Sequence, residues 1–218
     1  MSNVNKNGVK FGEKHSIDNW DLLMVQKNIS TPTPKTSYVE IPGSNGHLDL
    51  TEAFGEILYN SRSLSFNFDI FQSSDTWWNS RKIISNYLHG QTHKIVLDQD
   101  PEYYYTGRCS ISDFSNDFTV AHMTITAECD PYKYKIEETR ILTIISPATL
   151  VSCPNGRKRV VPTIIVDGTV NFEFENVSYS LGTGTHKILN IVFVEGNNKV
   201  NILSGEGTIE FVYRQADL

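Results

Sequence analysis

Histidine and cysteine are the side chains of this chain that could bind a transition metal. Two of the six histidines, His89 and His93, are four residues apart, and on a helix that spacing would let both imidazoles share a zinc ion. Gly90 is expected to end a helix between them. The three cysteines are far apart in the chain: Cys109, Cys129 and Cys153. The sequence therefore predicts surface or core histidines and buried apolar thiols, with no metal site and no disulfide framework.

Carboxylates are densest in the segment Asp98-Gln99-Asp100-Pro101-Glu102. Alternating carboxylates can bind calcium, and paired carboxylates can hydrolyse glycosidic bonds. The segment is too short for an EF-hand loop, and it lacks the glycine and the distal glutamate that such a loop places in register. We expect an acidic turn that connects two strands.

Signatures of covalent catalysis and of nucleotide binding are absent from the sequence. No Gly-x-Ser-x-Gly motif surrounds a nucleophile, and no glycine-rich turn leads into a helix with a Gly-Lys-Ser/Thr signature. A Ser/His/Asp triad leaves no signature when its members meet only in space, so that alternative stays open. The sequence predicts no enzyme, no catalytic or cofactor-binding residues, and no cofactor.

Trp77, Trp78 and the run Tyr103-Tyr104-Tyr105 are the aromatic residues that could stack against a sugar. Aromatic side chains more often bury a large area in a core or an interface while a polar group stays within reach of a partner. We expect Trp77 in the core and part of the tyrosine run in an interface.

The charge of the chain argues against a general nucleic-acid-binding protein. Its net charge is −6 and its pI is about 5.5, whereas such a protein needs a cationic surface that displaces counterions from phosphates. A local basic patch stays open as an alternative. The first 14 residues lack the apolar core of a secretory signal, and no apolar run approaches the ~20 residues that cross a bilayer. We expect a protein that is made in a cytoplasm and stays soluble there, without membrane insertion.

The elements that position these residues change character along the chain. Leu64, Phe66, Phe68 and Ile70 are apolar at strict period two, which predicts a half-buried strand. Residues 75–90 have helical spacing instead, with Ser74 or Asp75 as the cap and Gly90 as the end. The apolar stripe of this helix should pack on a sheet, and it consists of Trp77, Ile84 and Leu88, widened by Ile83 and Tyr87.

The segment before that strand contains weaker signals. Pro32 and Pro34 favour an extended loop or a sheet rim, because proline removes a backbone donor. Asn45-Gly46 favours a tight turn, and residues 47–50 alternate as a strand would. The stretch up to about Val25 is predicted as one or two short strands.

Beyond residue 137 the pattern is purely β. Candidate strands are 141–145, 160–166, 170–174, 177–181, 189–193, 200–202 and 209–213. Turn signals separate them at Pro154-Asn155-Gly156, Asp167-Gly168, Gly182-Thr183-Gly184, Gly196-Asn197-Asn198 and Gly205-Glu206-Gly207. Short strands at this spacing favour an antiparallel sandwich. We therefore expect two domains, residues 1–137 and 138–218.

Several segments together resemble the N-terminal domain of siphophage distal tail proteins, often called Dit, over residues 8 to 134. They are Phe11-Gly12, residues 39–52 with the sequence VEIPGSNGHLDLTE, Arg62 with its strand, Tyr87-Leu88-His89-Gly90 at the helix end, residues 98–108, and Asp130 to Tyr134. The C-terminal part is similar to the same family at Asn155-Gly156, Val161-Pro162, Gly184, His186, residues 196–198 and Phe211 to Arg214.

The resemblance implies a mainly β fold and a structural role. The N-terminal domain would be a β-barrel-like sheet with one packed helix, akin to tail-tube proteins, and the C-terminal domain a galectin-like antiparallel β-sandwich. Six copies would form a ring that joins the tail tube to the host-adsorption apparatus at the virion tail tip, after assembly in the host cytoplasm. The implied partners are the other copies of the ring, the major tail tube protein, the tail-associated lysin or tail tip protein, and a receptor-binding protein. The insertions that carry extra binding arms in this family are not evident here.

Two other functions remain as alternatives. A carbohydrate-binding module in host cell-surface adhesion would use the C-terminal sandwich, but all three tryptophans, the usual stacking floor of a galectin-type site, precede residue 137. A cell-wall hydrolase would need a catalytic constellation, and the sequence contains no such signature.

Overall fold

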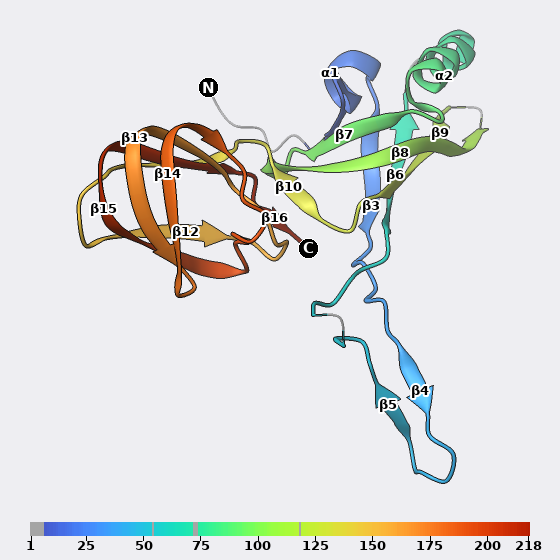
Figure 1. Cartoon of the computed structure of the whole chain (residues 1–218). Coiled ribbons are helices and arrows are strands. Elements are labelled where there is room, and N and C mark those ends of the chain that lie inside the picture. The colour runs from blue at the N-terminus through green and yellow to red at the C-terminus, as the bar shows by residue number, and fades with distance from the viewer. Residues whose placement is uncertain (1–6, 54, 72–73, 118) are drawn as a thin grey trace. The chain divides into compact units, whose positions relative to one another are not determined.

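The computed structural model describes residues 7–53, 55–71, 74–117 and 119–218, with the side chains of residues 74 and 75 left aside (Figure 1). The chain divides into two compact units between Lys133 and Tyr134. This division lies within several residues of the expected boundary at 137. Strands dominate both units and pair in antiparallel fashion, so the predicted mainly β fold is confirmed.

The N-terminal unit is built on one antiparallel sheet with the strand order β2-β1-β7-β8-β9-β6-β3. The bounds are β1 Val9–Phe11, β2 Lys14–His15, β3 Leu23–Ile29, β6 Arg62–Ile70, β7 Thr92–Leu97, β8 Asp100–Asn116 and β9 Ala121–Cys129. A two-stranded sheet, β4 Tyr38–Glu40 and β5 His47–Asp49, interrupts the connection from β3 to β6.

The core of this unit lies on one face of the sheet. The alternation predicted for residues 64–70 is confirmed, because Leu64, Phe66, Phe68 and Ile70 are buried. Helix α2, Ser74–Leu88, covers this face with three buried residues of the predicted stripe, Trp77, Ile84 and Leu88. Gly90 has φ +78°, as expected for the residue that ends a helix. The predicted cap at Ser74 or Asp75 lies outside the described side chains, and the prediction that Ile83 joins the stripe is wrong, since Ile83 is exposed.

Helix α1, Ser16–Trp20, is a short element that the sequence analysis missed. Its start is capped by the His15 side chain, whose Nδ1 accepts the N–H groups of Ile17 and Asp18 at 3.3 Å each. Its end is closed by Asp21 in the left-handed conformation with φ 53°. A single turn is too short to show helical periodicity, so only these caps could have indicated it.

The C-terminal unit contains one sheet with the order β11-β15-β13-β14, in which β12 also pairs with β15. The bounds are β10 Lys133–Lys135, which spans the division, β11 Thr139–Ile144, β12 Thr149–Asn155, β13 Thr163–Phe174, β14 Val177–His186, β15 Gly196–Tyr213 and β16 Ala216–Asp217. Its core includes Ile164, Phe172, Phe193, Ile202 and Phe211, all fully buried.

Several of the predicted turns and one predicted strand of this unit are wrong. Gly182-Thr183-Gly184 lies inside β14, and Gly196-Asn197-Asn198 is the paired start of β15. Asp167-Gly168 lies inside β13 and Gly205-Glu206-Gly207 lies inside β15, so these glycines bend long strands where turns were expected. Residues 189–193 form no strand, and only Phe193 makes an isolated bridge, to Val160. Strand β12 was not predicted, because its final residues carry the turn signal Pro154-Asn155.

The glycine bend has a clear steric cause. Gly168 lies opposite Gly207 and Val170 lies opposite Gly205, and the φ angles of the three glycines are +114°, +97° and +131°. A Cβ added at Gly207 would lie 1.8 Å from the carbonyl oxygen of Asp167. At these positions the backbones of the two paired strands approach more closely than a Cβ atom permits.

We predict that Gly207→Ala destabilises the C-terminal unit by about 3 kcal/mol or more, since backbone must move and φ is positive. Gly196→Ala is the matched control, because Gly196 has φ +97° but nothing within 4 Å of an added Cβ. The control should cost about 1 kcal/mol. Urea unfolding followed by circular dichroism measures both, and equal losses would contradict a steric origin of the bend.

Candidate subunit-contact surface

The residues considered for metal binding have structural roles. Among the described residues, no group of three or more His, Cys, Asp or Glu side chains could hold a metal ion. His89 Nδ1 accepts the backbone N–H of Ile111 at 3.2 Å. The His93 ring stacks on Tyr87 and its Nε2 lies 3.0 Å from the Tyr87 carbonyl oxygen, so Nε2 donates there. Both imidazoles are used to hold the end of α2 against its neighbours.

Asp98 and Gln99 form the predicted turn between strands, whereas Asp100-Pro101-Glu102, expected in the same turn, begin the next strand. Strand β7 ends at Leu97 and β8 begins at Asp100. The Asp98 carboxylate accepts the N–H of Gly8 at 2.9 Å and lies 3.1 Å from His15 Nε2. Because His15 Nδ1 accepts two backbone N–H groups at the start of α1, Nε2 carries the proton and donates it to Asp98. Asp98 therefore fixes the cap of α1.

All three cysteines are free and buried, as predicted. Burial raises the pKa of the Cys109, Cys129 and Cys153 thiols to about 12. A thiol with such a pKa is protonated at neutral pH, and only the thiolate is a nucleophile. These side chains act as small apolar residues of the two cores.

We predict that Ellman's reagent at about pH 8 labels none of the three thiols in the folded protein, because both burial and the raised pKa suppress the thiolate. All three should react after unfolding in guanidinium chloride. Rapid labelling of even one thiol under native conditions would contradict the burial of that cysteine.

The aromatic candidates differ in exposure and in the side chains beside them. Trp77 is buried in the core, as predicted, while Trp78 is 63% exposed and lies beside Arg81, whose Cζ is 5.5 Å from the ring centroid. Each tyrosine of the run has a cation over its ring: Lys133 over Tyr103, Lys94 over Tyr104 and Arg62 over Tyr105. Tyr104 and Tyr105 are buried, so the predicted interface role could involve only Tyr103.

The clearest candidate for a working surface is a two-stranded ribbon between β3 and β6, which we call the arm (residues 31–61). It leaves the sheet between two paired strands and extends away from it, and β4 and β5 form a separate sheet near its tip (Figure 1). Backbone bonds close the ribbon along its length: Asn60 N–H to Thr33 O at 2.9 Å, Lys35 N–H to Leu58 O at 2.7 Å, and Leu50 N–H to Ser37 O at 2.8 Å. The arm has no second layer among the described residues.

One face of the arm is apolar and uncovered. Val39 lies directly opposite Leu48, and Ile41 follows the end of β4. These three side chains are 44%, 49% and 48% exposed. The opposite face carries Tyr38 and His47, whose rings are in edge contact at 4.3 Å. An isolated ribbon of two strands is marginally stable in water, so a partner that covers the apolar face would stabilise it.

Arg62 anchors the arm where it rejoins the sheet. Its side chain is 6% exposed, and its Nε donates to the carbonyl of Ser30 at 2.9 Å, at the other end of the arm. Its Nη1 donates to the carbonyl of Pro131 at 3.3 Å, and its Cζ lies 5.1 Å from the centroid of Tyr105. One buried guanidinium thus joins both ends of the arm to the sheet.

The face of the sheet opposite the core is polar, and many of its side chains are hydrogen-bonded to side chains of the neighbouring strand. Thr124 Oγ1 donates to Asn67 Oδ1 at 3.1 Å, and Asn67 Nδ2 donates to Gln26 Oε1 at 3.2 Å. Ser110 and Thr126 are hydrogen-bonded at 2.9 Å, and His122 Nδ1 lies 2.7 Å from Asp69 Oδ1. Bonds between neighbouring strands therefore use many of the donors that could otherwise bind a phosphate.

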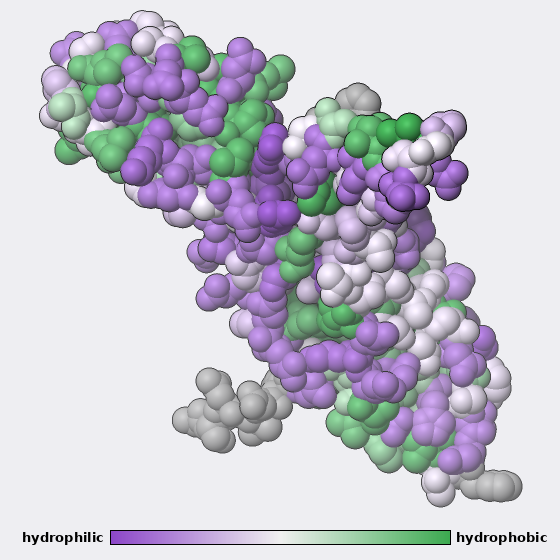
Figure 2. All heavy atoms as spheres, turned by 90° about the horizontal axis from the view of Figure 1, so that it is seen from below, coloured by the Kyte–Doolittle hydropathy of each residue, from purple (hydrophilic) through white to green (hydrophobic). Residues whose placement is uncertain are grey.

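The exposed apolar residues of the whole chain are spread over both units. On the face drawn in Figure 2, apolar areas interrupt the hydrophilic surface without merging into one large patch. Within the part of the chain that the structure describes, no helix is long and apolar enough to span a membrane. The arm is therefore distinguished by its geometry, a thin apolar ribbon, rather than by the area of an apolar patch.

Comparison with known proteins identifies this architecture. The sequence matches no protein-family model, and no curated protein matches it. The solved structures do include a match, the SPP1 Dit protein (gp 19.1), described as a paradigm of hub adsorption apparatus in Gram-positive infecting phages. The likeness has a TM-score of 0.69 and 15% sequence identity, and it covers 95% of this chain and 98% of that chain. Over nearly its whole length, the chain therefore has the fold of a phage distal tail protein.

Proposed function

We propose that this protein is the structural hub of a phage tail tip, a ring of six copies that joins the tail tube to the host-adsorption apparatus. The observation that carries the proposal is the extent of the likeness, which includes both units and leaves almost no part of either chain unmatched. A shared single domain would indicate only a common building block. A likeness that covers 95% of this chain and 98% of that chain supports a common architecture at the level of the whole protein.

The N-terminal unit offers the different surfaces that a ring needs. A closed ring is made of heterologous contacts, so each copy must present two unlike surfaces. The arm, with its uncovered apolar face, is one of them. The edge strand β3 carries two exposed apolar residues, Leu23 and Val25, at 51% and 54% exposure, and it contributes a second region. In this proposal, the arm of each copy lies on the next copy around the ring.

The polar face of the N-terminal sheet would line the lumen that continues the tail tube. DNA that passes through such a conduit must not adhere, and lysine or arginine side chains free to bind phosphates would hold it. On β6 and β9 this face carries hydroxyl and amide groups, His122, Asp69 and Glu128. On β8, Arg108 lies opposite Glu128, and its Nη1 donates to the carbonyl of Gly90. The charge of the whole chain is −6. These properties suit a surface that repels a polyanion.

The remaining contacts would be made with other virion proteins. The proposed partners are the major tail tube protein on one side of the ring and the tail-associated lysin or tail tip protein on the other, with the C-terminal unit directed outward, toward a receptor-binding protein. The proposal assigns no enzymatic activity to the chain. The proposed location is the virion tail tip, after assembly in the host cytoplasm.

The ring proposal predicts a homohexamer, or a monomer that assembles when a tail partner is added. Native mass spectrometry of the purified protein, alone and with the adjacent tail protein, measures the number of copies. Negative-stain images should show a ring with a central opening. A monomer that binds neither the tail tube protein nor the tail tip protein would overturn the proposal.

The contribution of the arm can be tested with the double variant Val39→Lys/Leu48→Glu. The two positions face each other across the ribbon, so opposite charges keep the arm together while its apolar face is lost. Burial of two such side chains stabilises a contact by about 3 kcal/mol, so assembly should weaken by roughly 100-fold or more.

The matched control is Leu142→Lys/Ile144→Glu, which makes the same exchange at two exposed residues of β11, 66% and 75% exposed. The control should assemble like the unchanged protein. If the arm variant assembles equally well, the arm does not form the subunit contact.

A further inference from the structure

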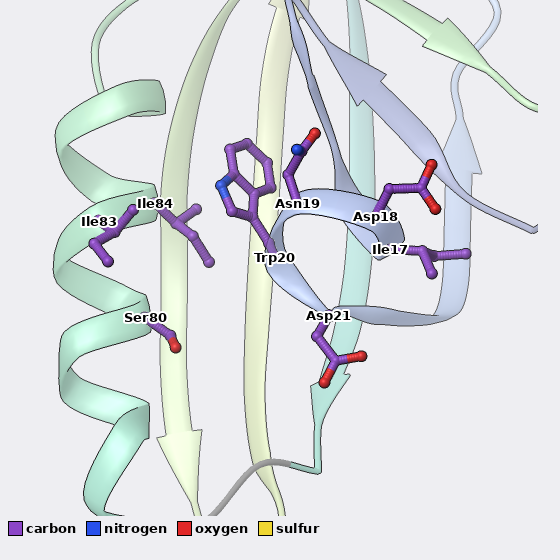
Figure 3. A pocket seen from close by; sticks show the side chains of 8 residues that line it. All are labelled: Ile17, Asp18, Asn19, Trp20, Asp21, Ser80, Ile83 and Ile84. Carbon is purple, nitrogen blue, oxygen red and sulfur yellow. The ribbon is translucent and has the colours of Figure 1, made fainter.

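Helix α2 contributes residues to two pockets on different sides. On the side that faces α1, Ser80 and Ile84 point toward the short helix and line a pocket beside Trp20 (Figure 3). A second pocket of about 480 Å³ lies between α2 and β8, and we call it the α2–β8 pocket. Its lining consists of Arg81, Ser85, Asn86, His89 and Ile111.

Helical spacing places three polar residues of the α2–β8 pocket in one row. Arg81, Ser85 and His89 follow one another at intervals of four residues, so they lie one above the other on the helix surface. The N–H of His89 donates to the Ser85 carbonyl at 2.9 Å, which continues the helical pattern past the end of α2. Ile111 of β8 packs against the core and gives the pocket an apolar side.

The guanidinium group of Arg81 is held in place by two aromatic rings. Its Cζ lies 5.5 Å from the ring centroid of Trp78 and 5.2 Å from that of Phe114, and the two rings are 5.6 Å apart. The five N–H donors of a guanidinium form a planar fork that matches a carboxylate. Within the described part of the chain, no acceptor is hydrogen-bonded to the Arg81 side chain. Arg81 therefore has a fixed position and an unused fork of donors.

The other polar side chains of the pocket can also donate hydrogen bonds. His89 Nδ1 accepts the backbone N–H of Ile111 at 3.2 Å, so the remaining ring nitrogen, Nε2, carries a proton even when the imidazole is neutral. The side chains of Ser85 and Asn86 form no hydrogen bond with another described residue. None of the described lining residues is an acid. The pocket thus combines one full positive charge with several donors.

This local positive charge stands on a chain whose net charge is −6. Arg81 and Lys82 are the two cations of α2, and neither forms an ion pair among the described residues. They form a small version of the local basic patch that the sequence left open. Charge complementarity therefore favours an anionic occupant of the α2–β8 pocket.

The exposed ring of Trp78 defines a second contact for such an occupant. Trp78 is 63% exposed and lies beside Arg81, at the edge of the pocket. In an extended segment, residues two positions apart point to the same side and are about 7 Å apart. This spacing is comparable with the 5.5 Å between Arg81 Cζ and the Trp78 ring. An acid and an apolar residue two positions apart would therefore reach both groups.

We propose that the α2–β8 pocket binds an extended segment of a partner protein, in which an aspartate or glutamate is followed two residues later by an apolar side chain. The carboxylate accepts hydrogen bonds from Arg81 and from His89 Nε2, and the apolar side chain lies on Trp78. This proposal goes beyond the ring and does not depend on it, because a single chain forms the whole pocket.

Two other anionic occupants fit less well. In the arm of a second copy, Glu40 and Asp49 point to the face opposite the apolar one, because neighbouring side chains of a strand alternate. An arm that placed these acids in the pocket would leave its apolar face uncovered. A nucleic acid is disfavoured by the charge of −6, since phosphates are repelled by an acidic chain.

The test uses the ¹⁵N-labelled full chain and two resonances, the indole N–H of Trp78 and the Nε–H of Arg81. The probe is the blocked peptide acetyl-Gly-Glu-Gly-Leu-Gly-amide, and the comparison peptides replace Glu by Gln or Leu by Ser. A ligand of this size should bind with a dissociation constant of about 1 mM. We expect saturable shifts of both resonances, with binding about tenfold weaker for the Gln peptide and about threefold weaker for the Ser peptide. Trp78→Phe assigns the indole resonance.

Three variants of the full chain, followed by the Trp78 resonance, separate the fork of donors from charge in general. Arg81→Gln should weaken binding about tenfold, because charge and fork are both lost. Arg81→Lys keeps the charge without the planar fork and should weaken binding about threefold. The matched control Lys82→Gln removes the adjacent exposed cation, which does not line the pocket, and should change binding by less than about twofold.

Several outcomes would overturn the proposal. They are equal binding of the Glu and Gln peptides, equal losses in Arg81→Gln and Lys82→Gln, or no shift at a peptide concentration of about 10 mM. Stronger shifts with an oligothymidylate than with the peptide would replace the acidic protein segment by a nucleic acid. Self-association of the unchanged chain in sedimentation, abolished by Arg81→Gln, would replace the partner protein by a second copy. Failure of the ring test leaves these measurements intact, because they use the pocket of one chain.

Discussion

The backbone of β6 and β9 places successive side chains on opposite faces of the N-terminal sheet. Apolar and polar residues alternate along both strands in step with this period of two. Leu64, Phe66 and Phe68 form one face with Met123 and Ile125, all buried. The apolar face must be covered, and α1 and α2 cover it, so both helices lie on this side. The polar face needs no cover, because its side chains bond to one another. One alternating pattern thus determines which side of the sheet can meet a solvent-filled space and which cannot.

The parts of the fold that the sequence predicted are those with a strong period. The strand 64–70 and the helix 74–88 each repeat their signal over several turns or residue pairs, so chance matches are unlikely to mimic them. Helix α1 has one turn, and its caps come from His15 and from Asp21, which are not strong capping signals on their own. The glycines of β13 and β15 were wrongly predicted as turns. A positive φ is needed both in a tight turn and where two paired strands approach closely. Only the pairing of Gly168 with Gly207, which is a long-range contact, distinguishes the two.

The candidate surfaces were less accessible to sequence reasoning than the fold. The arm contains Pro32, Pro34 and Asn45-Gly46, which indicate loop and turn, and its short strands were visible at residues 47–50. Nothing in those residues shows that the ribbon lacks a second layer, because that depends on which other segments reach it. The uncovered face of the arm is therefore a property of the tertiary arrangement.

Strand β15 has a consequence for how the C-terminal unit loses its structure. It pairs with β11 and β12 along one side and with β13 along the other, and its residues enter the core at both ends. No other strand in the described part of this unit has as many pairing partners. Because β11 and β12 pair with β15 and not with each other, loss of β15 removes the only strand partner of both and leaves β13 paired with β14 alone. The backbone amides of β11, β12 and β13 should therefore exchange with solvent in a single cooperative opening, as one foldon, rather than in layers.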